Sequence, residues 1–148
     1  MPSKPRIYLD SSALGRPFDD QSQPRIFRET QALIVIIGAI HDKSIELVSS
    51  DILEYEKNLS PDAARRKWVE SVLTMAQMKL AITDGIEQRG RELHNLGLKA
   101  IDALHAASAE AARVSSLISC DDRFAKRYRG PVRIIRPERF VLDLISAP

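Results

Sequence analysis

The sequence has a single cysteine, Cys120, among its 148 residues. One cysteine excludes a disulfide framework within the chain and a zinc site built from several cysteines, and it fits a reducing compartment. Aromatic residues make up only 5% of the chain, which argues against an aromatic stacking surface as the main device for holding nucleic acid. We therefore expect a cytoplasmic protein with an ordinary hydrophobic core.

Net charge and long hydrophobic runs are also scarce. The formal charge is only +2, so no basic field covers the whole molecule, and charge alone names no partner. The longest apolar run, residues 32–40, is too short to cross a bilayer as a helix, and the first residues lack the apolar segment of a signal peptide. No internal repeat or low-complexity tract divides the chain. We expect one domain over residues 1–148 and no membrane or export signal.

What the sequence does contain is short apolar runs that alternate with helical patterns. This alternation predicts an α/β fold, in which helical crossovers join four to five short strands of a mainly parallel sheet. Residues 15–24 have a loop composition, and residues 137–145 fit a helix or a strand equally well. The predicted strands are 6–9, 44–50, 115–119 and 132–136, and the predicted helices are 22–40, 51–59, 61–78, 84–95, 98–114 and 121–128.

Four acids occupy positions at the carboxyl edge of the predicted sheet, where parallel α/β proteins place their sites. Asp10 and Asp121 each follow a predicted strand, and Glu56 and Asp102 lie early in predicted helices. Each also has a structural explanation, as a turn residue, a helix cap or an acid that favours a helix N-terminus. Together their oxygens suit Mg²⁺ or Mn²⁺, because clustered carboxylates repel one another without a cation.

Helical spacing separates Glu56 from its neighbour Glu54. Glu56 lies three residues after Leu53 and three before Leu59, so it shares the face of these apolar side chains. We expect that face, Leu59 included, to point inward and Glu54 to be an ordinary solvated charge.

Four segments resemble the ordered motifs of a PIN domain, the nuclease fold of VapC-type toxins in bacterial toxin–antitoxin modules. They read "IYLDSSAL", "LVSSDILEYE", "GLKAIDALHAASAEAA" and "LISCDDRF". The resemblance runs from about residue 6 to about residue 142, and "IDALHAA" is its most specific piece. It implies a PIN-like three-layer α/β/α fold.

The resemblance also implies which residues do the chemistry. It favours Glu56 because family members place this acid six residues after the serine that closes the second strand, here Ser50. It favours Asp121 over Asp122 because the acid follows the strand-terminal hydroxyl, here Ser119, by two residues. The implied catalytic and metal-binding residues are Asp10, Glu56, Asp102 and Asp121, and the implied supporting residues are Ser11, Ser12, Ser119 and Asp122.

The implied activity is metal-assisted hydrolysis of RNA phosphodiester bonds, with Mg²⁺ or Mn²⁺ activating a water. The implied partners are RNA, including tRNA or other structured RNA, a cognate antitoxin protein and a second copy of the chain in a homodimer. Basic residues available as phosphate contacts are Arg16, Arg65, Arg66, Lys99, Arg123 and Lys126, with Lys67, Arg127 and Arg129 in reserve.

Other interpretations remain open. His105, three residues after Asp102, fits a packed, hydrogen-bonded histidine better than a ligand of a hard cation. A PIN fold that no longer cuts could serve as an RNA-binding or assembly module. A phospho-acceptor receiver domain fits less well, because the acidic pair expected beside the first strand is absent. A haloacid-dehalogenase-like phosphatase is excluded because Ser12 stands where it needs an aspartate.

Overall fold

The computed structural model describes residues 4–146, which form a single five-stranded sheet. Every pair of neighbouring strands is parallel, and the strand order is β3-β2-β1-β4-β5. This confirms the predicted α/β class and sharpens it from mainly parallel to wholly parallel. The strands are β1 (Arg6–Leu9), β2 (Glu46–Ser50), β3 (Met78–Leu80), β4 (Ser116–Ile118) and β5 (Arg133–Ile135).

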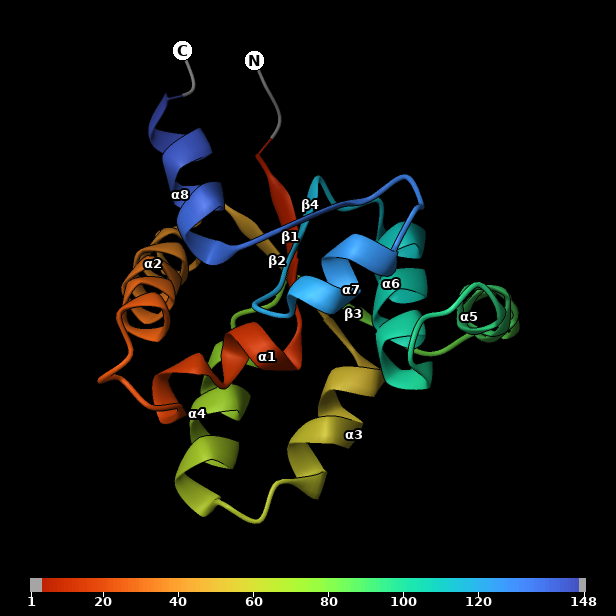
Figure 1. Cartoon of the computed structure of the whole chain (residues 1–148), viewed down its shortest axis with the longest axis horizontal. Coiled ribbons are helices and arrows are strands. Elements are labelled where there is room, and N and C mark those ends of the chain that lie inside the picture. The colour runs from red at the N-terminus through yellow and green to blue at the C-terminus, as the bar shows by residue number, and fades with distance from the viewer. Residues whose placement is uncertain (1–3, 147–148) are drawn as a thin grey trace.

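Helices cover both faces of the sheet, giving three layers. Figure 1 shows α2 and α8 on one side of the strands and α5 and α6 on the other. The shorter helices α1 and α3 lie where the strands end. The helices are α1 (Ser11–Leu14), α2 (Pro24–His41), α3 (Asp51–Leu59), α4 (Ala63–Leu73), α5 (Asp84–Asn95), α6 (Ala100–Ala112), α7 (Asp122–Arg127) and α8 (Pro137–Ser146), with one 3₁₀ turn, η1 (Arg16–Phe18).

The burial of the central strand β1 accounts for its apolar sequence. Ile7, Tyr8 and Leu9 have no exposed surface, because β2 and β4 flank the strand and helices cover both of its faces. A strand buried in this way reads as a continuous apolar run rather than as an alternating one. The aliphatic stretch at 34–37 is helical, as predicted, within α2.

The structure departs most from the predicted elements at residues 74–80. The helix predicted over 61–78 ends at Leu73, and Met78–Leu80 forms a strand, so the strand near 116 is the fourth along the chain. Gln77 fixes this edge strand, since its backbone N–H donates to the Leu47 carbonyl at 3.1 Å and its side-chain Oε1 accepts from the Leu47 N–H at 2.9 Å. The predicted loop contains η1, and residues 137–146 form a helix.

The strand order places the switch point of the sheet at the carboxyl ends of β1 and β4. The chain moves from β1 outward through β2 to β3, then crosses back to add β4 and β5 on the other side. The order therefore reverses between β1 and β4, and such switch points are where open parallel sheets bind ligands. Among residues 4–146, no helix is both long enough and apolar enough to cross a membrane.

Candidate active site

Asp10 follows β1 directly and caps the short helix α1. Its Oδ1 accepts from the Ala13 N–H at 3.0 Å and from the Ser12 hydroxyl at 2.7 Å. The side chain is nevertheless 3% exposed, and this burial raises the pKa of the carboxyl above its ordinary value despite the hydrogen bonds. Asp10 is thus both a helix cap and a buried carboxyl group at the switch point.

Ser12 joins the ends of β1 and β4. Its hydroxyl donates to Asp10, accepts from the Cys120 N–H at 2.9 Å and lies 3.2 Å from the Ser119 hydroxyl. Ser119 in turn accepts from the Asp121 N–H at 3.0 Å. The small hydroxyl residues therefore hold the backbone of both strand ends in one hydrogen-bonded group.

Glu56 extends from α3 toward α1 and α6. Its Oε1 accepts from the Ser11 hydroxyl at 2.6 Å and from Nε2 of His105. Partial burial opposes ionisation, but the contacts with His105 and Ser11 outweigh it, so the pKa of Glu56 is lowered. Glu54 instead pairs with Lys57 at 2.5 Å, and Leu59 is 63% exposed, which corrects the prediction that Leu59 points inward.

Asp102 lies in the first turn of α6, half-buried. Burial and the negative charges of Asp121 and Asp10 raise its pKa to about 6. His105 and Lys99 act in the opposite direction without cancelling the shift. The three aspartates therefore lie within one another's electrostatic field, with negative charge in excess.

Asp121 and Asp122 are adjacent but have different environments. Asp121 caps α7, because its Oδ1 accepts from the N–H groups of Arg123 at 3.0 Å and Phe124 at 3.3 Å. Asp122 is bound by Arg25 and by Arg136, and these guanidinium groups lower its pKa. The carboxylate of Asp122 is thus neutralised by arginines, whereas Asp121 contributes to the excess charge at Asp102.

The chemistry of these donors fits a hard divalent cation. All four predicted ligands offer oxygen, and the negative charges of Asp121 and Asp10, which together with burial raise the pKa of Asp102, are ones that a cation would compensate. Within residues 4–146, however, no three His, Cys, Asp or Glu side chains are grouped closely enough to hold an ion as they stand. Glu56 is also already bound through Oε1.

Two hollows flank the acids and contain basic residues. One, of about 340 Å³, is lined by Ser11, Glu56, Arg65 and Arg66 among others. The other, of about 330 Å³, includes Asp121, Lys126 and Arg136. Lys99 and Arg123 are exposed. In the sequence they lie three residues before Asp102 and two residues after Asp121.

Arg16 is less available than the other predicted phosphate contacts. Its guanidinium binds Glu29 at 2.6 Å and Asp19 at 3.1 Å. Glu29 is fully buried, so Arg16 compensates an internal charge.

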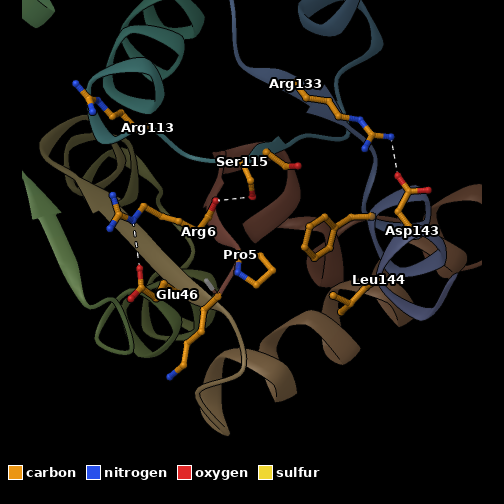
Figure 2. A pocket seen from close by; sticks show the side chains of 11 residues that line it. Pro5, Arg6, Glu46, Arg113, Ser115, Arg133, Asp143 and Leu144 are labelled. Atoms are coloured by element: carbon orange, nitrogen blue, oxygen red, sulfur yellow. Dashed lines mark hydrogen bonds and ion pairs between the residues drawn. The ribbon is translucent and has the colours of Figure 1, made fainter. Parts of the chain in front are cut away.

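A larger hollow, of about 680 Å³, lies at the opposite edge of the sheet, beside the starts of β1 and β4. Figure 2 shows that two of its basic residues are paired internally, Arg6 with Glu46 and Arg133 with Asp143. None of the four acids lines it. Size alone would therefore misplace the site.

Two residues that contact the site were missed in the sequence, Tyr8 and Ser50. The Tyr8 hydroxyl lies 2.6 Å from the Ser50 hydroxyl and 2.6 Å from Nδ1 of His105. A signal was present, because a tyrosine inside an otherwise aliphatic buried strand needs a partner for its hydroxyl. His105 is 2% exposed and hydrogen-bonded, as predicted for a packed histidine.

The fold and this edge of acids define a three-layer α/β protein with carboxyl groups at the switch point of a parallel sheet. Residues 7–130 match the family described as "PIN domain". The chain belongs to the PIN domain family, whose members are generally nucleases and often metal-dependent ribonucleases.

Among solved structures, the chain is similar to the crystal structure of PAE2754 from Pyrobaculum aerophilum. The two are 19% identical, with a TM-score of 0.61, and the match covers 96% of this chain and 90% of the other. At this identity the likeness supports the fold alone. No curated protein matches the chain.

Proposed function

We propose that this chain is a Mg²⁺- or Mn²⁺-dependent endoribonuclease. The observation that carries the proposal is the meeting of three aspartates at the switch point, where burial and the negative charges of Asp121 and Asp10 together raise the pKa of Asp102 to about 6. A divalent cation held by Asp10, Asp102 and Asp121, with Glu56 beside it, would polarise a phosphate oxygen and lower the pKa of a water. Membership of a nuclease family supports this assignment.

The residues of the chain have separate tasks in this proposal. Ser12 fixes Asp10, and Ser119 fixes the backbone before Asp121, so the two acids keep a defined spacing. Arg65 and Arg66 on one side, and Lys126 on the other, offer positive charge to the phosphates that flank the cut bond.

A cleavage assay with matched variants tests the activity. Wild-type protein should cut a pool of structured RNA in Mg²⁺ or Mn²⁺ and not in EDTA. Asp102→Asn and Glu56→Gln should abolish cutting, whereas Glu54→Gln, which changes the acid of the same helix that pairs with Lys57, should leave it unchanged. Full activity of Asp102→Asn would contradict the assignment.

We further propose the biological setting that the family resemblance implies: a cytoplasmic toxin that forms a homodimer and is bound by a cognate antitoxin protein. Expression of the wild-type chain should then arrest bacterial growth, and the Asp102→Asn variant should not. Co-expression with the product of an adjacent small gene should restore growth. Growth unaffected by an RNA-cutting protein would oppose the toxin role alone.

The second candidate is a PIN fold that binds RNA without cutting it. The hydrogen bonds from Ser11 and His105 to Oε1 of Glu56 favour it to this extent, since only the second oxygen of this carboxylate is left for a cation. RNA binding that persists in EDTA, together with intact RNA after incubation in Mn²⁺, would select this candidate.

A further inference from the structure

A buried chain of hydrogen bonds leads from the core to Glu56. It runs from the Ser50 hydroxyl to the Tyr8 hydroxyl, from there to Nδ1 of His105, and from Nε2 of His105 to Glu56. Ser50, Tyr8 and His105 are each at most 2% exposed. The chain connects β2, β1, α6 and α3, so four separate elements determine where one carboxylate lies.

Each polar atom in this chain of hydrogen bonds can be assigned as a donor or an acceptor. The Glu56 carboxylate can only accept, so Nε2 of His105 carries a proton. In a neutral imidazole, Nδ1 then accepts from the Tyr8 hydroxyl, which accepts from the Ser50 hydroxyl. Ser50 completes the sequence by accepting from the Leu53 N–H at 3.3 Å.

The chain of hydrogen bonds and the Ser11 hydroxyl both end at the same oxygen of Glu56. Both His105 and Ser11 bind Oε1 of Glu56, while Oε2 has no hydrogen-bond partner within residues 4–146. Side-chain rotation of a glutamate would ordinarily exchange its two oxygens. Two donors on Oε1 oppose that exchange.

We propose that Tyr8 and His105 are positioning residues that hold Oε1 of Glu56 and thereby present Oε2 to the ligand of the active site. This inference rests on the proposed function, because the ligand is the cation or its water. Groups that orient metal-binding side chains from behind typically change metal affinity or activity by about 10- to 100-fold when removed.

Tyr128 supplies a matched control. Tyr128 is also a buried residue, and its hydroxyl donates to a glutamate, Glu110, at 2.7 Å and accepts from the Val132 N–H at 3.1 Å. Glu110 pairs with Arg89 and is not one of the site acids. Tyr128→Phe therefore removes an equivalent hydroxyl without touching Glu56.

The test compares Tyr8→Phe with Tyr128→Phe by RNA cleavage kinetics, Mn²⁺ titration calorimetry and urea unfolding. Tyr8→Phe should lower kcat and weaken Mn²⁺ binding, each by roughly 10-fold, with KM for RNA little changed. Tyr128→Phe should lose comparable stability and keep wild-type kcat and Mn²⁺ affinity. Equal behaviour of the two variants would overturn the inference.

His105 is tested by rescue. A glutamine amide can still donate to Glu56, so His105→Gln should retain more activity and Mn²⁺ affinity than His105→Leu. Equal losses in both variants would oppose the positioning role.

Imidazole ¹⁵N correlation spectra of the wild type keep the inference separate from the function. They should show a proton on Nε2, and the Nδ1 resonance should shift in Tyr8→Phe. A bare Nε2 would overturn the inference. A wild-type protein with these spectra but without RNA cleavage or Mn²⁺ binding would refute the proposed function. The geometry of the hydrogen-bond chain would then still stand.

Discussion

Arg25 binds Asp122 through two hydrogen bonds, of 2.8 and 2.9 Å, from its two terminal nitrogens. The same guanidinium donates to the Cys120 carbonyl at 3.2 Å. The contact joins α2 to the first turn of α7, and Asp121 is the cap of that turn. An arginine far away in the sequence therefore anchors the segment that carries one of the site acids.

Loss of this arginine should loosen α7. We expect Arg25→Ala to lower the free energy of unfolding by about 1 kcal/mol, the upper range for a partly exposed pair. Hydrogen exchange at residues 122–127 should become faster. Arg139→Ala is the control, since Arg139 pairs with Asp143 on a more exposed face, and it should change neither quantity. Unchanged exchange in Arg25→Ala would show that Arg136 alone holds Asp122.

Asp102 should make stability depend on pH. Its pKa rises from about 3.8 in the unfolded chain to about 6 in the folded protein, so the folded state binds the proton more tightly. Stability is therefore lost as the pH rises between these values. Asp102→Asn removes the loss, and its melting temperature in the absence of divalent cations should exceed that of the wild type at pH 7.5, by roughly 3 °C, but not at pH 4. A difference independent of pH would contradict this assignment of the shift.

Ser12 should be more important than its exposed counterpart Ser22, which makes the same type of contact with Asp20. Ser12→Ala leaves the Cys120 N–H without its partner and removes a bond to buried Asp10. We expect a loss of about 2 kcal/mol in chemical denaturation. Ser22→Ala should stay within about 0.5 kcal/mol of the wild type. Similar losses in both would mean that burial of the bond has no effect.

Divalent cations should stabilise the protein in a pH-dependent manner. A cation at about 100 times its dissociation constant adds about 2.7 kcal/mol to the folded state. Scanning fluorimetry should show a rise in melting temperature with Mn²⁺ at pH 7.5 and a smaller rise at pH 5, because Asp102 is then largely protonated. NaCl at matched ionic strength is the control. Equal shifts of the melting temperature with NaCl and with Mn²⁺ would show that the protein has no specific site for divalent cations.

Much of the fold could be predicted from the sequence, because local sequence patterns determine most of its helices and strands. The apolar run of β1 and the helical pattern of α3 each depend on residues close together in the sequence, and both elements lie where predicted. Strand β3 could not be found in this way. Its Met78 continues a helical spacing, and only pairing with β2, 30 residues away at Gln77 and Leu47, makes it a strand.

The positions of the four acids along the fold could be predicted from the sequence, whereas their hydrogen bonds could not. The acids sit next to strand ends and helix starts, which the sequence reveals. The contact between His105 and Glu56 spans 49 positions, and that between Tyr8 and His105 spans 97. Such pairs depend on how α3 and α6 lie against β1, which no local pattern encodes.

The strand order also has a consequence during synthesis on the ribosome. One side of the central strand β1 pairs with residues 116–118, so a nascent chain that ends earlier leaves this strand open to solvent. The same incomplete chain lacks Asp121. If the proposed cutting activity is correct, we expect it to arise only after most of the polypeptide has emerged, and a product that ends before residue 116 should not cut RNA.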